Sequence, residues 1–263
     1  MAMTNAKTTI AALVAQFAIA LDIRQNLDAI LSIVSDAAPD TLVILPEGSL
    51  SGYAEDAAFL NEIDRQLLAN ALHNLREAVV RHGVHLVFGS CLYENDKWYN
   101  TGIYYGPQQK QFVYRKVNLA IGERTVFAAG SQLSPFKLDV NGCTVNLGIQ
   151  LCREIRFPEQ WQHLARAGAD VFAYLTNAVG DADQAFIWRS HLVSRAAENQ
   201  RFILCANNAD IAQKCPTMIV TPTGHVPWEV CSPGYEVGHY TLDLSAVSNW
   251  YLSQSRRDLI VGE

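Results

Sequence analysis

The chain has 263 residues, of which 49% are hydrophobic and 17% are charged, and its formal net charge is −6. Soluble proteins average about 25% charged residues, so this composition excludes a disordered or low-complexity chain and predicts one large hydrophobic core. The negative balance, without any block of Lys or Arg, argues against nucleic acid or an anionic membrane as the main partner.

Apolar runs typical of buried strands recur along the chain, and patterns with a helical period separate several of them. In chain order we predict strand 9–16, helix 25–37, strand 41–46, helix 62–82, strands 85–93 and 99–106, strand 145–152, helix 158–168, strand 170–177, helix 184–200, and strands 202–208 and 217–222. Residues 93–116 alternate with turn signals and predict a hairpin run. The order indicates an α/β fold in which helices flank a mixed sheet or a pair of sheets. No linker divides the sequence, so we expect a single domain over residues 1–263.

The six cysteines predict reduced thiols rather than disulfides or a metal site. No CxxC pair occurs, and most of the cysteines lie inside apolar runs, at positions 91, 143, 152, 205, 215 and 231. His82 and His85 form an HxxH pair, but no further ligand lies at a metal-like spacing, so we expect no metal. We therefore expect a reducing compartment, the cytoplasm.

The N-terminal segment has two interpretations. Lys7 precedes the apolar residues 9–21, and Ala18-Ile19-Ala20 is similar to a signal-peptidase site. Gln16 interrupts the apolar run, which is also too short to span a membrane. The alternative to an export signal is a first buried strand.

Three predicted strands end at residues that can carry chemistry. Glu47 follows strand 41–46, Cys152 ends strand 145–152, and Lys116 follows the strand-like QFVYR. Open α/β sheets present reactive groups beyond the carboxyl ends of their strands. A carboxylate can deprotonate a thiol, and an ammonium group can stabilise an oxyanion. Each residue also has a structural interpretation: Glu47 as a loop cap, Lys116 as a surface charge, and Cys152 as a small core residue.

The segments around these residues resemble the three signature segments of the nitrilase superfamily, the carbon–nitrogen hydrolases with a Glu-Lys-Cys triad. The segments are LPEGSLSGYAED, YRKVNLAIGERTVFAAG and LGIQLCREIRFPEQW. Supporting similarity covers nearly the whole chain, at Gln16, at Asn26 and in residues 188–208, 216–226 and 255–259.

The resemblance implies a role for each triad residue and for several neighbours. Glu47 would be the general base, Cys152 the nucleophile, and Lys116 an oxyanion donor together with the backbone N–H of Arg153. The supporting or substrate-binding residues would be Glu123, Tyr53, Arg153, Asn177 and Ala178. Loop anchoring is the alternative for Glu123 and Tyr53. For Arg156 and Glu159 we expect a buried ion pair beneath the nucleophile.

The family fold implied by the resemblance is a four-layer α-β-β-α sandwich, paired through helices next to the nucleophile into a homodimer or higher homo-oligomer. It makes residues 9–16 a first strand rather than part of an export signal, and it implies no cofactor. Two positions depart from many relatives: Asn118 stands where His is frequent, and Arg153 stands where Tyr or Trp is frequent. Arg153 could bind a substrate carboxylate, or it could point away into an ion pair with Glu154 or with a neighbouring subunit.

The segment CREIRFPE is more similar to the amidase and carbamoylase branches than to true nitrilases. The resemblance therefore implies a thiol-dependent hydrolase of a small linear amide, such as an ω-amide or an N-carbamoyl amine, which acts through a Cys152 acyl-enzyme and releases ammonia. Two alternatives stay open: nitrile hydrolysis by the same triad, and a silent binding or scaffold protein. Acyl transfer to an amine is a further possibility, since the acyl-enzyme is shared. In each enzymatic case the partner is a small molecule.

Overall fold

Two mixed six-stranded sheets form the frame of the computed structural model, which describes residues 8–178, 182–213 and 215–256. The first sheet has the order β12 (Glu236–Asp243), β1 (Thr9–Gln16), β2 (Leu42–Ile44), β3 (His85–Glu94), β4 (Lys97–Tyr105) and β5 (Gln111–Arg115). The second has the order β11 (Trp228–Val230), β10 (Thr217–Val220), β9 (Phe202–Ala206), β8 (Val171–Leu175), β7 (Cys143–Leu151) and β6 (Phe136–Val140). In each sheet three consecutive strands are parallel, β1-β2-β3 and β7-β8-β9, and the flanking strands are antiparallel.

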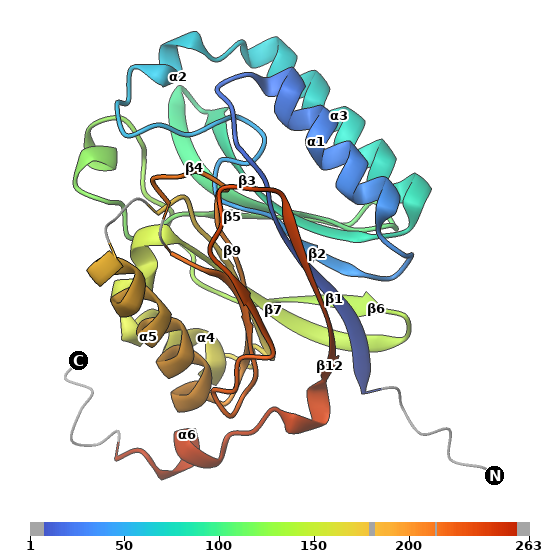
Figure 1. Ribbon diagram of the computed structural model, residues 1–263, viewed down its shortest axis with the longest axis vertical. Coiled ribbons are helices and arrows are strands. Elements are labelled where there is room, and N and C mark those ends of the chain that lie inside the picture. Colours follow the sequence, from blue (N-terminus) through green and yellow to red (C-terminus); the bar gives the residue numbers. More distant parts are fainter. Residues whose placement is uncertain (1–7, 179–181, 214, 257–263) are drawn as a thin grey trace.

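Helices cover the outer faces of both sheets (Figure 1). The long helices α1 (Ile23–Asp36) and α3 (Arg65–His82) lie side by side on the first sheet, and α4 (Pro158–Arg166) and α5 (Ala182–Asn199) cover the second. Asp22 and Asp64 begin α1 and α3, because their carboxylates accept hydrogen bonds from the exposed N–H groups of the first turns. The short helices α2 (Phe59–Glu62) and α6 (Trp250–Gln254) complete the arrangement.

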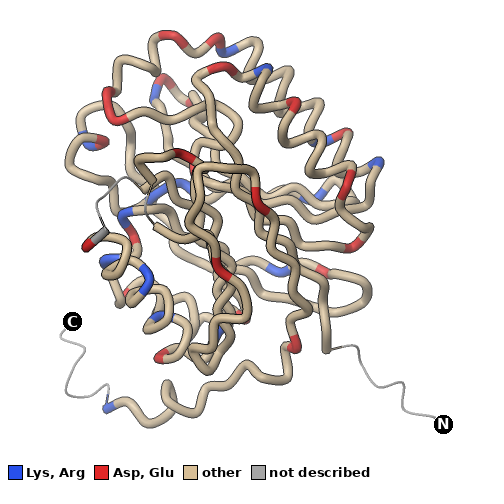
Figure 2. Tube along the Cα trace, in the orientation of Figure 1, with Lys and Arg blue, Asp and Glu red and all other residues tan. Residues whose placement is uncertain are grey.

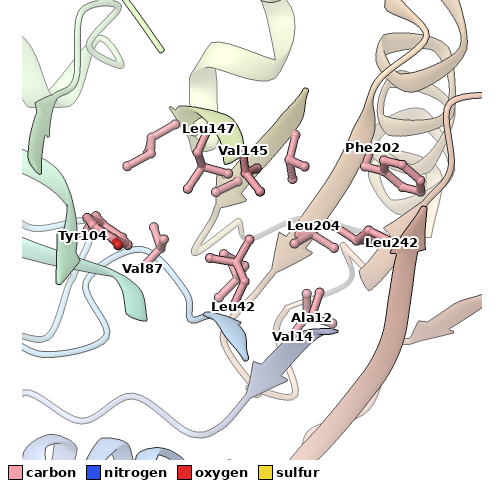
Figure 3. Packing of buried hydrophobic residues seen from close by; sticks show 14 of the residues in the cluster. Ala12, Val14, Leu42, Val87, Tyr104, Val145, Leu147, Phe202, Leu204 and Leu242 are labelled. Carbon is pink, nitrogen blue, oxygen red and sulfur yellow. The ribbon is translucent and has the colours of Figure 1, made fainter. Parts of the chain in front are cut away.

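Alternation along the strands explains why the sheets stack in layers. Successive side chains of a strand point to opposite faces, so a strand that is apolar throughout can bury both. In β2, Leu42 and Ile44 belong to the core between the two sheets, whereas Val43 packs under α1 and α3. The core between the sheets includes Val145 and Leu147 of β7 and residues of several other strands (Figure 3). The result is the four-layer α-β-β-α sandwich that the resemblance implied.

The predicted strands and helices all occur, with small shifts at their ends. Three strands that the sequence pattern did not indicate are β6, β11 and β12. The HxxH pair is divided between α3 and β3, and His85 is buried with its Nδ1 2.8 Å from the hydroxyl of Tyr104. Among the described residues, no group of three or more His, Cys, Asp or Glu side chains is placed to hold a metal ion. In the same residues, no helix has the length and apolarity needed to cross a membrane.

Candidate active site

Strands from both sheets deliver Glu47, Lys116 and Cys152 to one buried site. Lys116 directly follows β5, Cys152 directly follows β7, and Glu47 lies just beyond β2. Lys116 Nζ lies 3.1 Å from Glu47 Oε1, and each of the two side chains is 1% exposed. Cys152 is close enough for the charges of Glu47 and Lys116 to act on its thiol. The structure therefore brings together the three residues that the sequence placed at strand ends.

A tight turn holds Glu47 against strand β3. Gly48 has a φ of +67°, a conformation that suits glycine, and a Cβ atom there would lie 2.5 Å from Tyr53 Cβ. A Cβ atom on Gly89 of β3 would lie 2.5 Å from Glu47 Cα. Larger residues at these two positions would therefore displace Glu47 from the site.

Cys152 occupies a strained turn between β7 and a short 3₁₀ helix, Cys152–Arg156. Its φ of +34° is unusual for a residue with a side chain and is typical of positions whose conformation the surroundings enforce. Tyr174 enforces it from β8, because its hydroxyl donates a 2.7 Å hydrogen bond to the Cys152 carbonyl oxygen. Trp188 Nε1 in turn donates to the Tyr174 hydroxyl at 2.9 Å. The turn leaves the Cys152 residue half-buried, in contrast to the buried residues 147–151 that precede it.

Glu123 adds a second carboxylate to the site. Lys116 Nζ lies 2.9 Å from Glu123, so one ammonium group is shared by two carboxylates. Asn100 Nδ2 bridges the same pair, at 2.8 Å from Glu47 Oε1 and 2.7 Å from Glu123 Oε1. The Tyr53 hydroxyl also donates to Glu123 Oε1, at 2.9 Å. Glu123 and Tyr53 thus fix the geometry around Lys116.

The pKa shifts of the three residues follow from burial and from their mutual charges. Burial raises the pKa of the Cys152 thiol to about 12, and the charge of Glu47 acts in the same direction. Burial also raises the pKa of Glu47, against the opposing charge of Lys116. For Lys116, burial alone would lower the pKa, but the charges of Glu47, Cys152 and Glu123 outweigh it and raise the pKa. At neutral pH the site therefore pairs a protonated thiol with a fixed cation, beside a Glu47 carboxyl group that is more basic than an exposed one.

We expect Lys116→Met to lower the free energy of unfolding by about 3–5 kcal/mol, because it leaves two buried carboxylates without their cation. Urea unfolding at neutral pH measures the loss. Lys137→Met, at an exposed position of β6, is the matched control and should change the free energy of unfolding by less than about 0.5 kcal/mol. A loss below about 1 kcal/mol for Lys116→Met would contradict a strongly coupled buried cluster.

Asn177 and Ala178 follow β8, and Asn177 forms a hydrogen bond with Glu47. The backbone N–H of Asn177 donates to Glu47 Oε2 at 3.1 Å, and its side-chain oxygen accepts from Gln213 Nε2 at 2.7 Å. Ala178 is buried in the apolar cluster under α4 and α5, and its N–H donates to Asn207 Oδ1 at 3.1 Å.

Arg153 does not pair with Glu154, so that expectation was wrong. Arg153 is exposed, while Glu154 is fully buried and accepts its hydrogen bonds from Tyr114, Gln160 and backbone N–H groups. A buried carboxylate binds the donors that surround it, and the neighbouring Arg153 side chain lies in solvent. Asn118 is half-buried, and its N–H donates to Glu154 Oε1 at 3.1 Å.

The expected ion pair between Arg156 and Glu159 is also absent from the described residues. Arg156 donates to Gln184 Oε1 at 3.1 Å and lies over the ring of Trp188, 5.1 Å from its centroid. Glu159 is exposed in the first turn of α4. There its negative charge is stabilised by the positive end of the helix dipole, so it does not need Arg156 as a partner. Arg156 packs against α5 instead.

Two residues that sequence reasoning missed are central to the site. Asn100 comes from β4, in the middle of a hairpin, and Glu154 lies two residues beyond Cys152. An Asn inside an otherwise aromatic strand was the one available signal for Asn100, since a buried amide needs hydrogen-bond partners.

Comparison with known proteins identifies the family of this chain. The family model of the carbon–nitrogen hydrolases matches residues 10–251. The chain is 30% identical to an (R)-stereoselective amidase of Pseudomonas sp., over 90% of this chain and 84% of the relative. It is 32% identical to a 2-oxoglutaramate amidase of Bacillus subtilis (strain 168), over 70% of this chain and 71% of the relative. Its fold is similar to a solved structure of the amidase from Nesterenkonia sp. AN1 in complex with butyramide, with a TM-score of 0.81, 23% identity and 95% of each chain covered. The chain therefore belongs to the carbon–nitrogen hydrolase family, as the sequence motifs indicated.

Proposed function

We propose that this carbon–nitrogen hydrolase cleaves a small linear amide, such as an ω-amide or an N-carbamoyl amine, with Cys152 as nucleophile, Glu47 as general base and Lys116 as oxyanion donor. The observation that carries the proposal is the position of a buried carboxyl group and a buried ammonium group beside a protonated thiol at a strained turn. A neutral thiol is a poor nucleophile, and a carboxylate within reach activates it.

The reaction has two halves that use the same residues. In the first, Glu47 takes the thiol proton while Cys152 Sγ attacks the amide carbon, and Lys116 Nζ with the Arg153 N–H stabilises the oxyanion. The intermediate collapses as the C–N bond breaks, Glu47 returns the proton to nitrogen, and ammonia leaves a thioester on Cys152. In the second, Glu47 deprotonates water, which attacks the thioester and releases the carboxylic acid and the thiol. A carbamoyl substrate yields carbon dioxide as well.

The amidase relatives support amides over nitriles as the substrate class. The test is ammonia release from matched pairs, such as butyramide and butyronitrile, together with 2-oxoglutaramate as an ω-amide. We expect turnover of at least one amide at a kcat/KM at least about tenfold above that of its matched nitrile. Turnover of nitriles alone would establish the nitrilase alternative, and no turnover together with a Cys152 inert to iodoacetamide would establish a silent member.

Three features beyond the chemistry complete the proposal. We infer one hydrolase domain over residues 1–263, since the family match spans 10–251 and the two sheets share one core. Six cysteines that form no disulfide support a cytoplasmic location. Charges of both signs are interspersed along the outer helices and loops (Figure 2), which supports a small-molecule partner rather than nucleic acid.

We infer a homodimer that uses α5 and α6. These helices contact each other and expose three large aromatic side chains, with Phe186 73%, Trp250 59% and Tyr251 54% exposed. Trp250 and Tyr251 contact each other, and exposed aromatic side chains that cluster in this way mark association surfaces. Sedimentation velocity of the full chain tests this inference, and a monomer at micromolar concentration would contradict it.

A further inference from the structure

The carboxylate of Glu154 is the most heavily bonded acceptor next to the triad. Its side chain is completely buried. Oε2 accepts from the Leu151 N–H at 2.8 Å, and Oε1 accepts from the Tyr114 hydroxyl at 2.7 Å, the Val117 N–H at 3.0 Å and the Asn118 N–H at 3.1 Å. Among the ion pairs of the described residues, none includes Glu154. Neutral donors make its hydrogen bonds, and the charge of Lys116 acts on it without a direct ion pair.

These donors come from two segments that carry catalytic groups. Val117 and Asn118 directly follow Lys116 in the first sheet, and Leu151 directly precedes Cys152 in the second. No strand ladder joins the two sheets in the described residues, so this pairing of segments does not rest on sheet hydrogen bonds. Glu154 is thus one side chain whose two oxygens tie the Lys116 segment to the Cys152 turn.

Burial of Glu154 restricts the movement of the two segments that it connects. Desolvation raises the pKa of Glu154, and the hydrogen bonds from Tyr114, Leu151 and Asn118 oppose that shift. A shift of either segment away from the carboxylate would leave a buried acceptor without its donor, and an unsatisfied buried polar group is unfavourable. Both segments are therefore held at the positions where all donors reach Glu154.

We propose that Glu154 is a positioning residue for the hydrolysis proposed above: it sets Lys116 Nζ and the Arg153 N–H at the spacing from Cys152 that the oxyanion requires. None of its hydrogen bonds reaches Lys116 Nζ or Cys152 Sγ, so it acts through the backbone on either side of them. Oxyanion donors work only within a narrow range of distance, and a misplacement of about 1 Å costs about 10²-fold in rate.

The test compares Glu154→Gln with Glu159→Gln, a control in the same motif that removes an exposed carboxylate. Glu154→Gln keeps the shape of the side chain but turns an NH₂ group toward an N–H donor. We expect kcat, counted per Cys152 that reacts with iodoacetamide, to fall by about 10²-fold while KM changes by less than about threefold. A merely structural role predicts fewer reactive sites with an unchanged kcat per site, and that result would overturn the proposal.

Alkylation keeps the test independent of amide turnover. We expect iodoacetamide to label the Cys152 peptide at pH 7 about tenfold more slowly in folded Glu154→Gln than in Glu159→Gln. The reason is that Lys116 and Glu47 are displaced from their positions beside the thiol in Glu154→Gln. If the wild type hydrolyses no amide, the proposed function fails, and equal labelling rates would separately overturn the role of Glu154. Should Glu154→Gln not fold, Glu154→Asp keeps both acceptor oxygens on a shorter side chain. We then expect smaller decreases in kcat per reactive Cys152 and in the rate of labelling by iodoacetamide. The absence of both decreases would overturn the proposal.

Discussion

Cys152→Ala is expected to reduce amide hydrolysis by at least about 10⁴-fold, because no other group in the site can form the thioester. The protein should stay folded, since the side chain is only half-buried and alanine fills most of the same space. Steady-state ammonia release measures the loss, and circular dichroism checks the fold.

Cys231→Ala is the matched control for Cys152→Ala. Cys231 is exposed and lies outside the candidate site, and its replacement should leave kcat within about twofold of the wild type. Hydrolysis by Cys152→Ala at the wild-type rate would remove Cys152 from the mechanism. A loss of equal size in Cys231→Ala would show that the chemistry had been assigned to the wrong thiol.

Glu47→Gln is expected to lower kcat by about 10³-fold, because a thiol with a pKa of about 12 needs a base to react at neutral pH. Glutamine keeps the shape and accepts the hydrogen bond from the Asn177 N–H, so folding should be preserved. Glu62→Gln, an exposed change in α2, is the control and should have no effect. Unchanged turnover in Glu47→Gln would exclude Glu47 as the base.

The pH dependence of kcat/KM in the wild type also tests Glu47 as the general base. Burial raises the pKa of Glu47, so this carboxylate loses its proton at a higher pH than an exposed glutamate does. Only the ionised form accepts the thiol proton, so kcat/KM should rise with pH along an acid limb that lies above the usual range for glutamate. This limb should disappear from the residual activity of Glu47→Gln.

The sequence pattern predicted most of the fold because the central strands are apolar on both faces. β2, β8 and β9 are continuous apolar runs, and each lies where the pattern put it. β6 has the sequence FKLDV, and β12 has polar residues at alternate positions. Such strands have one exposed face and occupy or border sheet edges, so their pattern is weak until a partner strand is known.

The proximity of Glu47, Lys116 and Cys152 was predictable because they stand at strand ends inside recognisable motifs, whereas the residues that support them were not predictable. Asn100 acts on Glu47 and Glu123 from a strand far away in sequence, and only the packed sheets reveal that contact. Glu154 was taken as a partner for Arg153 because the two are adjacent in sequence. The structure shows instead that burial selects donors from Tyr114, Val117 and Asn118, more than 30 residues away.

The central claim is that Cys152 carries the acyl group during amide hydrolysis, and mass spectrometry tests it most directly. The protein is mixed with an amide that it hydrolyses, quenched in acid within the first turnovers, and digested for peptide mapping. We predict the mass of the acyl group on the Cys152 peptide, no added mass on the peptides of the other five cysteines, and no adduct in Cys152→Ala. Steady ammonia release with the acyl mass on a different residue would contradict the account.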